Sequence, residues 1–280
     1  MQRSIWQYWE TKGEKPAFID GLHELARRNS GCDVVLVTPD NLGEYLPTVP
    51  NDVFRIKVLA HKADMIRAML LARHGGMWLD SDALVLRDLT HLFDLLDDHD
   101  FVAFNNSGLL QKQRPWVRVN CILSRPQGRI AQQWVLQQHA KFPKVVYSWE
   151  EIGTELLHPI CLENRSHVKI LPFERICPIP WNRVNEFVGA GDEKRVLDDC
   201  YIVMLSNASI AKRVPGLRQL SCQDIAEGDY LLSAIMRAAL SGRPVDCRTE
   251  SSIVAPRVKS LETGQGTLHK LASRIVRSIK

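Results

Sequence analysis

The sequence has no apolar run long enough to cross a membrane, no paired cysteine motif and no strong excess of charge of one sign. No apolar stretch reaches the ~20 residues that a membrane-spanning helix requires. The seven cysteines are odd in number, widely spaced and without a C-x-x-C pair, so we expect reduced thiols rather than a disulfide framework or a zinc site. The formal net charge is only +4, which argues against a nucleic-acid-binding surface.

The short motifs of several enzyme classes are also missing. The sequence contains no Walker phosphate-binding loop and no G-x-S-x-G nucleophile elbow. Its composition, with 45% hydrophobic and 24% charged residues, is that of an ordinary globular protein. The N-terminus leads into an aromatic strand pattern instead of a signal-peptide pattern, so we expect a cytoplasmic protein.

Strand and helix patterns alternate along the chain. A strand pattern at 4–9 is followed by a helical pattern at 16–29 and a β-branched run at 33–38, and such a βαβ unit predicts a parallel sheet. No repeat or low-complexity linker interrupts the first 254 residues. We therefore expect one α/β domain over residues 1–254 and a tail over residues 255–280. Further strands are predicted at 77–79, 101–104, 168–171 and 201–205, and further helices at 59–74 and 129–139.

The tail holds the excess positive charge. It contains six basic residues and a single acid, Glu262. Apolar residues recur in it at helical spacing, namely Leu268, Leu271, Ile275 and Ile279. A basic amphipathic helix is typical of a membrane-surface contact, so we expect weak, peripheral docking at the inner face of the plasma membrane. The alternative is a C-terminal helix that packs on its own domain or frays.

The strongest local feature is the segment from Lys62 to Asp82. Asp64 and Arg67 are three residues apart on a predicted helix and therefore share a face. Asp80 and Asp82 flank a single residue directly after a predicted strand. In parallel α/β sheets ligands bind beyond the C-terminal ends of the strands, and carboxylate oxygens there suit Mg²⁺ or Mn²⁺ bridging a diphosphate. Taken alone, the D-x-D pair is a weak signal and is more often a solvated turn, since acidic pairs in turns are common.

The whole segment resembles the DxD sugar-transferase region shared by capsular polysaccharide synthesis proteins, initiating yeast mannosyltransferases and the large clostridial glucosylating toxins. In that family a helix reading approximately S/A-D-x-x-R precedes G-G-x-Y/W-x-D-x-D. This chain has the corresponding residues in order, namely Ala63-Asp64, Arg67, Gly75-Gly76, Trp78, Asp80 and Asp82. Weaker similarity at 5–9, 151–157 and 171–181 extends the resemblance over about residues 4–210, and the opening segment is closest to the capsular branch.

The resemblance implies a Rossmann-like GT-A fold and a glycosyltransferase of bacterial capsular or other surface polysaccharide synthesis. A nucleoside diphosphate sugar, with a UDP-sugar favoured, would be the donor, and a glycan or lipid-linked glycan hydroxyl the acceptor. Family membership also suggests a Mn²⁺ or Mg²⁺ cofactor and retention at the anomeric carbon.

By motif position, the resemblance assigns catalysis to four residues, and three of them would also hold the donor. Asp64 and Arg67 would hold the hydroxyls of the donor sugar and the diphosphate. Asp80 would contact the ribose or the sugar, and Asp82 would bind the metal ion. Forked, charge-assisted hydrogen bonds make arginine a suitable partner for a phosphate.

Five further residues are assigned to the substrates or the metal. Trp6 would stack on the base, since an indole offers a flat apolar face, and Gln7 and Lys62 would join it around the donor nucleotide. Asn120 falls near a family position that lines the acceptor side. As metal ligands we take Asp80, Asp82 and Asn207.

The chain departs from the family at one expected metal ligand. Where many relatives have a histidine in the late strand, this sequence has Met204, and a thioether is a poor ligand for Mg²⁺ or Mn²⁺. Ser206 or Asn207 can supply an oxygen instead, or water can complete the shell. The departure also admits a non-catalytic module that binds a nucleotide sugar or a glycan.

A phosphohydrolase of the haloacid dehalogenase type is a second alternative, because such enzymes also place D-x-D after an apolar strand. Their motif ends the first strand of the domain, whereas here it follows a βαβ unit and a helix that ends at Gly75-Gly76. The transferase hypothesis is therefore preferred.

Overall fold

A six-stranded sheet forms the centre of the computed structural model, which describes residues 2–11, 13–105 and 117–242. The tail expected at 255–280, together with its predicted membrane contact, lies outside the described residues. Among the residues described, no helix combines the length and apolarity needed to span a bilayer.

The strand order of the central sheet is β2-β1-β3-β6-β5-β7. Its pairings are parallel except those of β6, which runs antiparallel to both of its neighbours. The strands are β1 (Ser4–Tyr8), β2 (Asp33–Val37), β3 (Gly76–Leu79), β5 (Phe101–Asn105), β6 (Val117–Ser124) and β7 (Val168–Pro172). β1 and β3 are buried along their whole length, as expected for strands covered on both faces.

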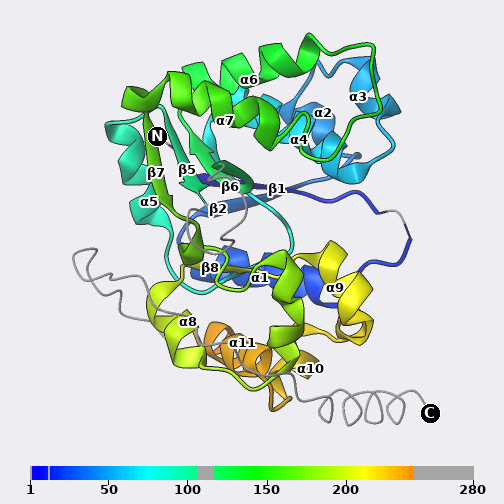
Figure 1. Ribbon diagram of the computed structural model, residues 1–280, viewed down its shortest axis with the longest axis vertical. Helices are drawn as coiled ribbons and strands as arrows, with labels where there is room; N and C mark the ends of the chain where they lie inside the picture. Colours follow the sequence, from blue (N-terminus) through cyan, green and yellow to red (C-terminus); the bar gives the residue numbers. More distant parts are fainter. Residues whose placement is uncertain (1, 12, 106–116, 243–280) are drawn as a thin grey trace.

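Helices lie on both sides of this sheet (Figure 1). On one side are α4 (Leu59–His74), α6 (Arg129–His139) and α7 (Thr154–Glu163), with the short α2 (Leu42–Tyr45) and α3 (Asn51–Arg55) nearby. On the other side lies α1 (Phe18–Asn29) with a two-stranded sheet, β4 (Ala83–Val85) and β8 (Ile202–Met204). The remaining helices are α5 (Thr90–Asp94), α8 (Glu193–Asp199), α9 (Asn207–Arg213), α10 (Cys222–Ala226) and α11 (Leu231–Ser241), with 3₁₀ turns at 95–97, 165–167, 173–175, 181–188 and 215–219.

Helix α4 differs from a surface helix in the polar side chains that it buries. Its buried residues include His61, Lys62, Asp64 and Arg67 beside a run of aliphatic ones. Helix α4 directly precedes β3 and runs antiparallel to it. The N-terminal half of α4 therefore lies beside the C-terminal ends of β1 and β3. Buried polar residues at these strand ends mark them as the place for a ligand.

The mixed α/β fold predicted from the sequence is confirmed. The predicted helices 59–74 and 129–139 have the observed bounds, and the predicted strands in the central sheet agree to within one residue. The predicted strand at 201–205 exists as β8, but it pairs with β4 instead of joining the main sheet. Strand β6 and helices α7 to α11 were not anticipated. The domain boundary at residue 254 stays a prediction.

We predict that Gly76→Ala destabilises the protein by about 2–4 kcal/mol, because left-handed backbone strain and overpacking add. Gly76 has φ +92°, and a Cβ atom there would lie 2.6 Å from the carbonyl oxygen of Ser4. Gly43 has no atom within 4 Å of an added Cβ, so Gly43→Ala is the matched control and changes stability by less than about 0.5 kcal/mol. Urea unfolding followed by circular dichroism measures both, and equal midpoints for the two variants would contradict the prediction.

Candidate active site

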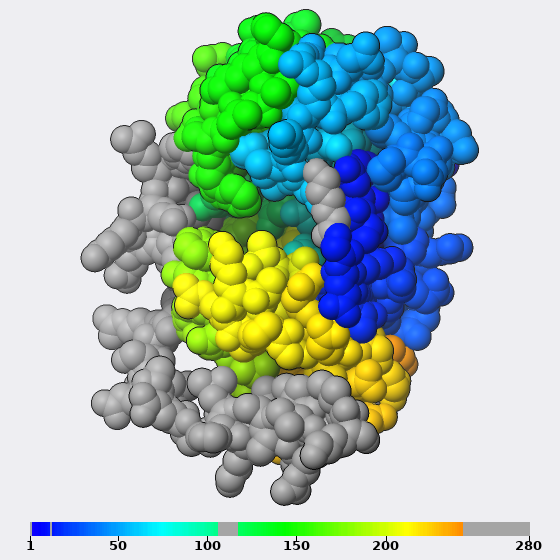
Figure 2. All heavy atoms as spheres, turned by 90° about the vertical axis from the view of Figure 1, so that its right-hand side faces the viewer, coloured from blue at the N-terminus to red at the C-terminus, as the bar shows by residue number. Residues whose placement is uncertain are grey.

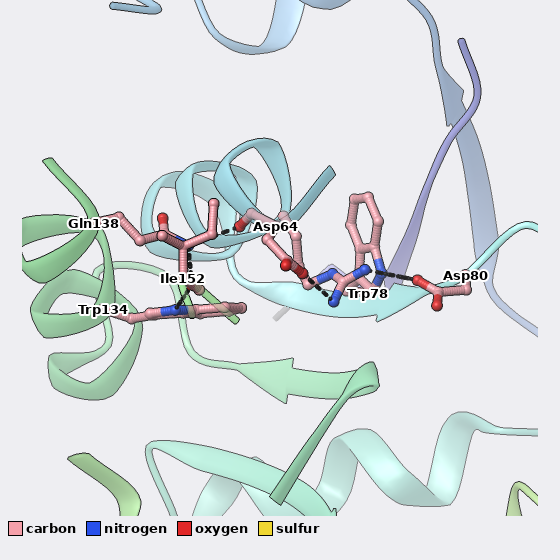
Figure 3. Close-up of polar contacts among 7 residues, drawn as sticks. Asp64, Trp78, Asp80, Trp134, Gln138 and Ile152 are labelled. Carbon is pink, nitrogen blue, oxygen red and sulfur yellow. Dashed lines mark hydrogen bonds and ion pairs between the residues drawn. The ribbon is translucent and has the colours of Figure 1, made fainter. Parts of the chain in front are cut away.

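The site is built around the buried guanidinium of Arg67 on α4. One terminal nitrogen donates to Oδ1 of Asp64 at 2.9 Å, and the other donates to Oδ1 of Asp80 at 2.8 Å. The guanidinium also lies over the ring of Trp78, 4.7 Å from its centroid. The indole N–H of Trp78 donates to the same Asp80 oxygen at 2.7 Å (Figure 3). Helix α4 and strand β3 are thus joined through one cation, and the predicted Asp64, Arg67 and Asp80 do meet.

Asp82 lies against the segment that follows β8. Its Oδ2 accepts the backbone N–H of Asn207 at 2.7 Å, and its backbone carbonyl accepts the N–H of Leu205. Ser206, between these two residues, has φ +57°, a left-handed conformation that is costly for a residue with a Cβ and that tends to occur at functional sites. The β4–β8 pairing therefore brings the predicted Asn207 to Asp82 across more than a hundred residues of chain.

The donor groups near Asp80 and Asp82 fit a hard divalent cation. Besides the two carboxylates, the side-chain oxygen Oδ1 of Asn207 is buried without a hydrogen-bond partner among the described residues, and so is Oδ1 of Asn120. Asn120 also accepts the Asp80 N–H at its carbonyl, at 3.0 Å. Carboxylate and amide oxygens are the ligands that Mg²⁺ and Mn²⁺ prefer. No group of three or more histidine, cysteine or acidic side chains in the described ranges has the arrangement of a metal site.

Met204 is a core residue. It pairs with Ala83 in the β4–β8 ladder and is 2% exposed. The side chain at this position therefore contributes to packing, and the oxygen-bearing residues follow it at the end of the strand.

A second set of buried contacts connects Asp64 to α6 and to the segment before α7. Nε2 of Gln138 donates to the backbone carbonyls of both Asp64 and Ile152, at 3.0 and 2.9 Å. The indole N–H of Trp134 donates to the Ile152 carbonyl as well, at 2.9 Å (Figure 3). The next residue, Gly153, approaches so closely that an added Cβ would lie 2.9 Å from Oδ2 of Asp64. The turn at 152–153 is therefore held against the Asp64 carboxylate.

Trp6, which is predicted to stack on the base, is a buried side chain in the structure. Its side chain is 5% exposed, and its indole N–H donates to the Gly75 carbonyl at 2.8 Å. The rings of Tyr45 and His74 pack on it, with centroids 5.3 and 5.2 Å away. Trp6 thus joins β1 to the end of α4, and its stacking on a base stays a prediction.

The other two predicted nucleotide contacts are also engaged within the protein. Gln7 is fully buried, and its side-chain oxygen lies 2.6 Å from Nδ1 of His23. The ammonium of Lys62 contacts both oxygens of Glu10 at 2.9 Å, at the C-terminal end of β1. Lys62 therefore reaches the same edge of the sheet as Asp80, but as one half of an ion pair.

The sequence of residues 1–142 matches the model of the family described as capsular polysaccharide synthesis protein. The chain belongs to that family. The resemblance inferred from the D-x-D segment is thereby confirmed. No curated protein sequence matches this family member.

The structure is similar, over part of its length, to several solved glycosyltransferases, with TM-scores under 0.5. PaToxG glycosyltransferase is 10% identical, covering 58% of this chain and 69% of its own, with a TM-score of 0.44. A glycosyltransferase involved in glycosylation of the major capsid of PBCV-1 is 12% identical, covering 78% and 100%, with a TM-score of 0.47. GlyE of Streptococcus pneumoniae TIGR4 is 14% identical, covering 86% and 60%, with a TM-score of 0.44. At these identities and TM-scores, the functions of those proteins are not assigned to this chain.

Sequence reasoning missed the roles of Trp78, Gln138 and Ile152 in this capsular polysaccharide synthesis protein. For Gln138 a signal was present. In the helical pattern at 129–139 it follows Ile130 and Trp134 at intervals of four, so it continues the apolar stripe and is expected to be buried. A polar group at such a position requires a buried partner, although its identity depends on tertiary contacts.

Burial raises the pKa of all three site carboxyls. It raises that of Asp64 to about 7, and the nearby carboxylates of Asp80 and Glu150 add to the shift while Arg67 opposes it. The pKa of Asp82 is raised to about 6 by burial and by the charge of Asp80, against the N–H of Asn207. Burial also raises the pKa of Asp80, against Arg67 and the hydrogen bond from Trp78. The site thus concentrates negative charge that water solvates poorly.

We predict that Gln138→Leu lowers the free energy of unfolding by about 1–3 kcal/mol, because two buried carbonyls lose a donor. Gln137 is exposed on the same helix, so Gln137→Leu is the matched control and shifts stability by less than about 0.5 kcal/mol. Urea unfolding of the two variants measures the difference. A Gln138→Leu protein as stable as the control would mean that the contacts of Gln138 do not hold the turn.

We also predict that the metal-free protein loses stability as the pH rises from about 5 to about 7. A carboxyl whose pKa is raised on folding binds its proton more tightly in the folded state, so its contribution to stability falls as it ionises. Asp82→Asn removes one such group and should reduce the loss by on the order of 1–2 kcal/mol. Urea midpoints at three pH values in the presence of EDTA test this. The control is Asp40→Asn, at an exposed turn position, which should leave the pH dependence of the urea midpoint as in the wild type. The same pH dependence in Asp82→Asn as in the wild type would refute the prediction.

Proposed function

We propose that the protein is a metal-dependent, retaining glycosyltransferase of the GT-A type. It would transfer a sugar from a nucleoside diphosphate sugar, with a UDP-sugar favoured, to a glycan or lipid-linked glycan hydroxyl in surface polysaccharide synthesis. The observation that carries the proposal is the pairing of Arg67 with both Asp64 and Asp80. A single residue separates Asp80 from Asp82, whose carboxylate accepts the backbone N–H of Asn207. Membership of the capsular polysaccharide synthesis family supports the same activity.

Asp82 and Asn207, with Asp80, are the residues proposed to hold a divalent cation. When bound, such a cation neutralises negative charge on the departing diphosphate. The backbone N–H of Asn207 fixes one oxygen of Asp82, which leaves the other carboxylate oxygen and the unpaired amide oxygen of Asn207 to face a ligand. The buried Met204 is not needed for this set.

Arg67 has a different proposed role from the one suggested by motif position. Both of its terminal nitrogens are bound to carboxylates, and the side chain is 4% exposed. We therefore propose that Arg67 orients Asp64 and Asp80 instead of gripping the diphosphate. Asp64 and Asp80 then present their remaining oxygens to hydroxyl groups of the donor.

The acceptor hydroxyl requires a proton acceptor, and the departing phosphate can serve. In this proposal the glycosidic bond to the phosphate breaks, the acceptor oxygen bonds to the anomeric carbon on the same face, and the hydroxyl proton moves to a phosphate oxygen. The basic tail at 255–280, which would hold the enzyme near a lipid-linked acceptor, remains a prediction from the sequence.

A thermal-shift panel of nucleotide sugars with and without Mn²⁺ tests the proposal. At 100 times its dissociation constant a ligand adds about 2.7 kcal/mol to stability, so one UDP- or GDP-sugar should raise the melting temperature only when Mn²⁺ is present. Asp82→Asn should abolish that shift, and the exposed-site control Asp40→Asn should keep it. Release of the nucleoside diphosphate from the same donor measures turnover.

The outcomes separate the candidate functions. Metal-dependent binding with release of the nucleoside diphosphate supports the transferase. Binding without release, in the presence of an acceptor extract, would instead indicate a nucleotide-sugar-binding module. No shift with any donor would reject both.

A further inference from the structure

Trp149 is a large aromatic side chain that the fold leaves exposed beside the candidate site. Its side chain is 69% exposed, whereas Trp6, Trp78 and Trp134 are buried. It belongs to the segment 148–153 between α6 and α7. Exposure of an indole is unfavourable in water and is typical of tryptophans that contact a partner through a large, rigid face.

The backbone around Trp149 is fixed by polar contacts on both sides. The N–H and hydroxyl of Ser148 donate to Oε2 of Glu151, at 2.9 and 3.2 Å. Glu151 also pairs with Lys141 and Lys144. An exposed side chain on a fixed backbone is prepared for binding, since less conformational freedom is lost when a ligand arrives.

The same segment reaches the catalytic carboxylates. Glu150 forms an ion pair with Arg118 of β6, at 2.5 Å, and it lies near enough to Asp64 to raise the pKa of that carboxyl. Gly153 packs directly on the Asp64 carboxylate. Trp149 is therefore connected to the site through Glu150 and Gly153, which lie close to Asp64.

His61, one turn before Asp64 on α4, supports Trp149 from inside. The ring centroids of His61 and Trp149 are 6.2 Å apart, and Tyr147 packs edge-on against the same imidazole. His61 is only 4% exposed, yet neither of its ring nitrogens has a hydrogen-bond partner within the described part of the chain. A buried polar group without a partner is unfavourable, and burial lowers the pKa of His61, which favours the neutral ring with one donor and one acceptor.

Figure 2 shows that the surface is hollowed between the green and cyan segments above and the yellow segment below. The upper segments include α4 and the region that leads into α7, and the yellow segment includes α9, which begins at Asn207. The yellow segment that contains α9 thus borders this hollow from below, and the green segment that leads into α7 borders it from above.

We propose that Trp149, supported by His61, forms a subsite for a sugar ring of the acceptor glycan. The inference rests on the proposed glycosyl transfer and specifies its acceptor side. A pyranose has a face of C–H groups that packs on the electron-rich face of an indole. An acceptor sugar is favoured over the donor because Glu150 links this segment to β6, on the side of β3 opposite to β1.

The test uses saturation-transfer NMR on the full chain with the methyl glycosides of glucose, galactose, mannose, N-acetylglucosamine and rhamnose. At least one glycoside should receive saturation from the wild-type protein. Trp149→Ala should weaken its binding by about tenfold, equivalent to about 1.4 kcal/mol, while Trp149→Phe retains most of it. Leu136→Ala is the matched control, since Leu136 is equally exposed, at 68%, on α6. Because Trp149 is exposed, its loss should leave the melting temperature unchanged.

Addition of UDP with Mg²⁺ distinguishes an acceptor subsite from a donor subsite. Glycoside binding that persists with UDP and Mg²⁺ present and depends on Trp149 supports the proposal. Displacement of the glycoside by UDP and Mg²⁺ would assign Trp149 to the donor and overturn it, as would the absence of any Trp149-dependent signal across the five glycosides. UDP binding, followed separately by calorimetry, reports on the proposed function itself, so the two can fail independently.

Discussion

The buried guanidinium of Arg67 is the interaction on which the site depends. Removing a cation from water is expensive, and the cost is offset only when its partners are close and well oriented. Here two carboxylates and an indole face supply that compensation. Because Asp64 lies on α4 and Asp80 follows β3, the same contacts fix the helix relative to the sheet. Loss of Arg67 would leave two carboxylates buried without their counter-charge.

Around this centre, each neighbouring element is held by contacts to backbone atoms. Gln138 and Trp134 hold the 152–153 turn through carbonyl groups, and the Asn207 N–H fixes Asp82. The amide oxygen of Asn207 is thereby left without a hydrogen-bond partner among the described residues. Such support is what preorganised binding sites require, since a side chain held by its neighbours does not have to reorganise when substrate arrives.

The sequence predicted those parts of the fold and site that depend on local spacing. Asp64 and Arg67 share a helix face because they are three residues apart, and Asp80 and Asp82 lie at the sheet edge because they follow a buried strand. Contacts between distant segments were less accessible. Asn207 was predicted as a metal ligand without any local spacing to place it, whereas Gln138 owes its position to the packing of α6 on α4 and Trp149 lies against His61 of α4. The burial of Trp6 was equally inaccessible from the sequence, since an aromatic strand residue can face either a ligand or the core.

The charge balance of the site gives a physical reason for a divalent cation. Asp64, Asp80 and Asp82 with Arg67 leave a net charge of −2 when ionised, and burial raises the pKa of each of the three carboxyls. A diphosphate would add further negative charge in the same place. A hard dication beside Asp82 and Asn207 would favour the ionised carboxylates and the diphosphate together. Donor and metal should therefore bind cooperatively, because the cation offsets the negative charge of the diphosphate and the diphosphate adds negative charge that attracts the cation.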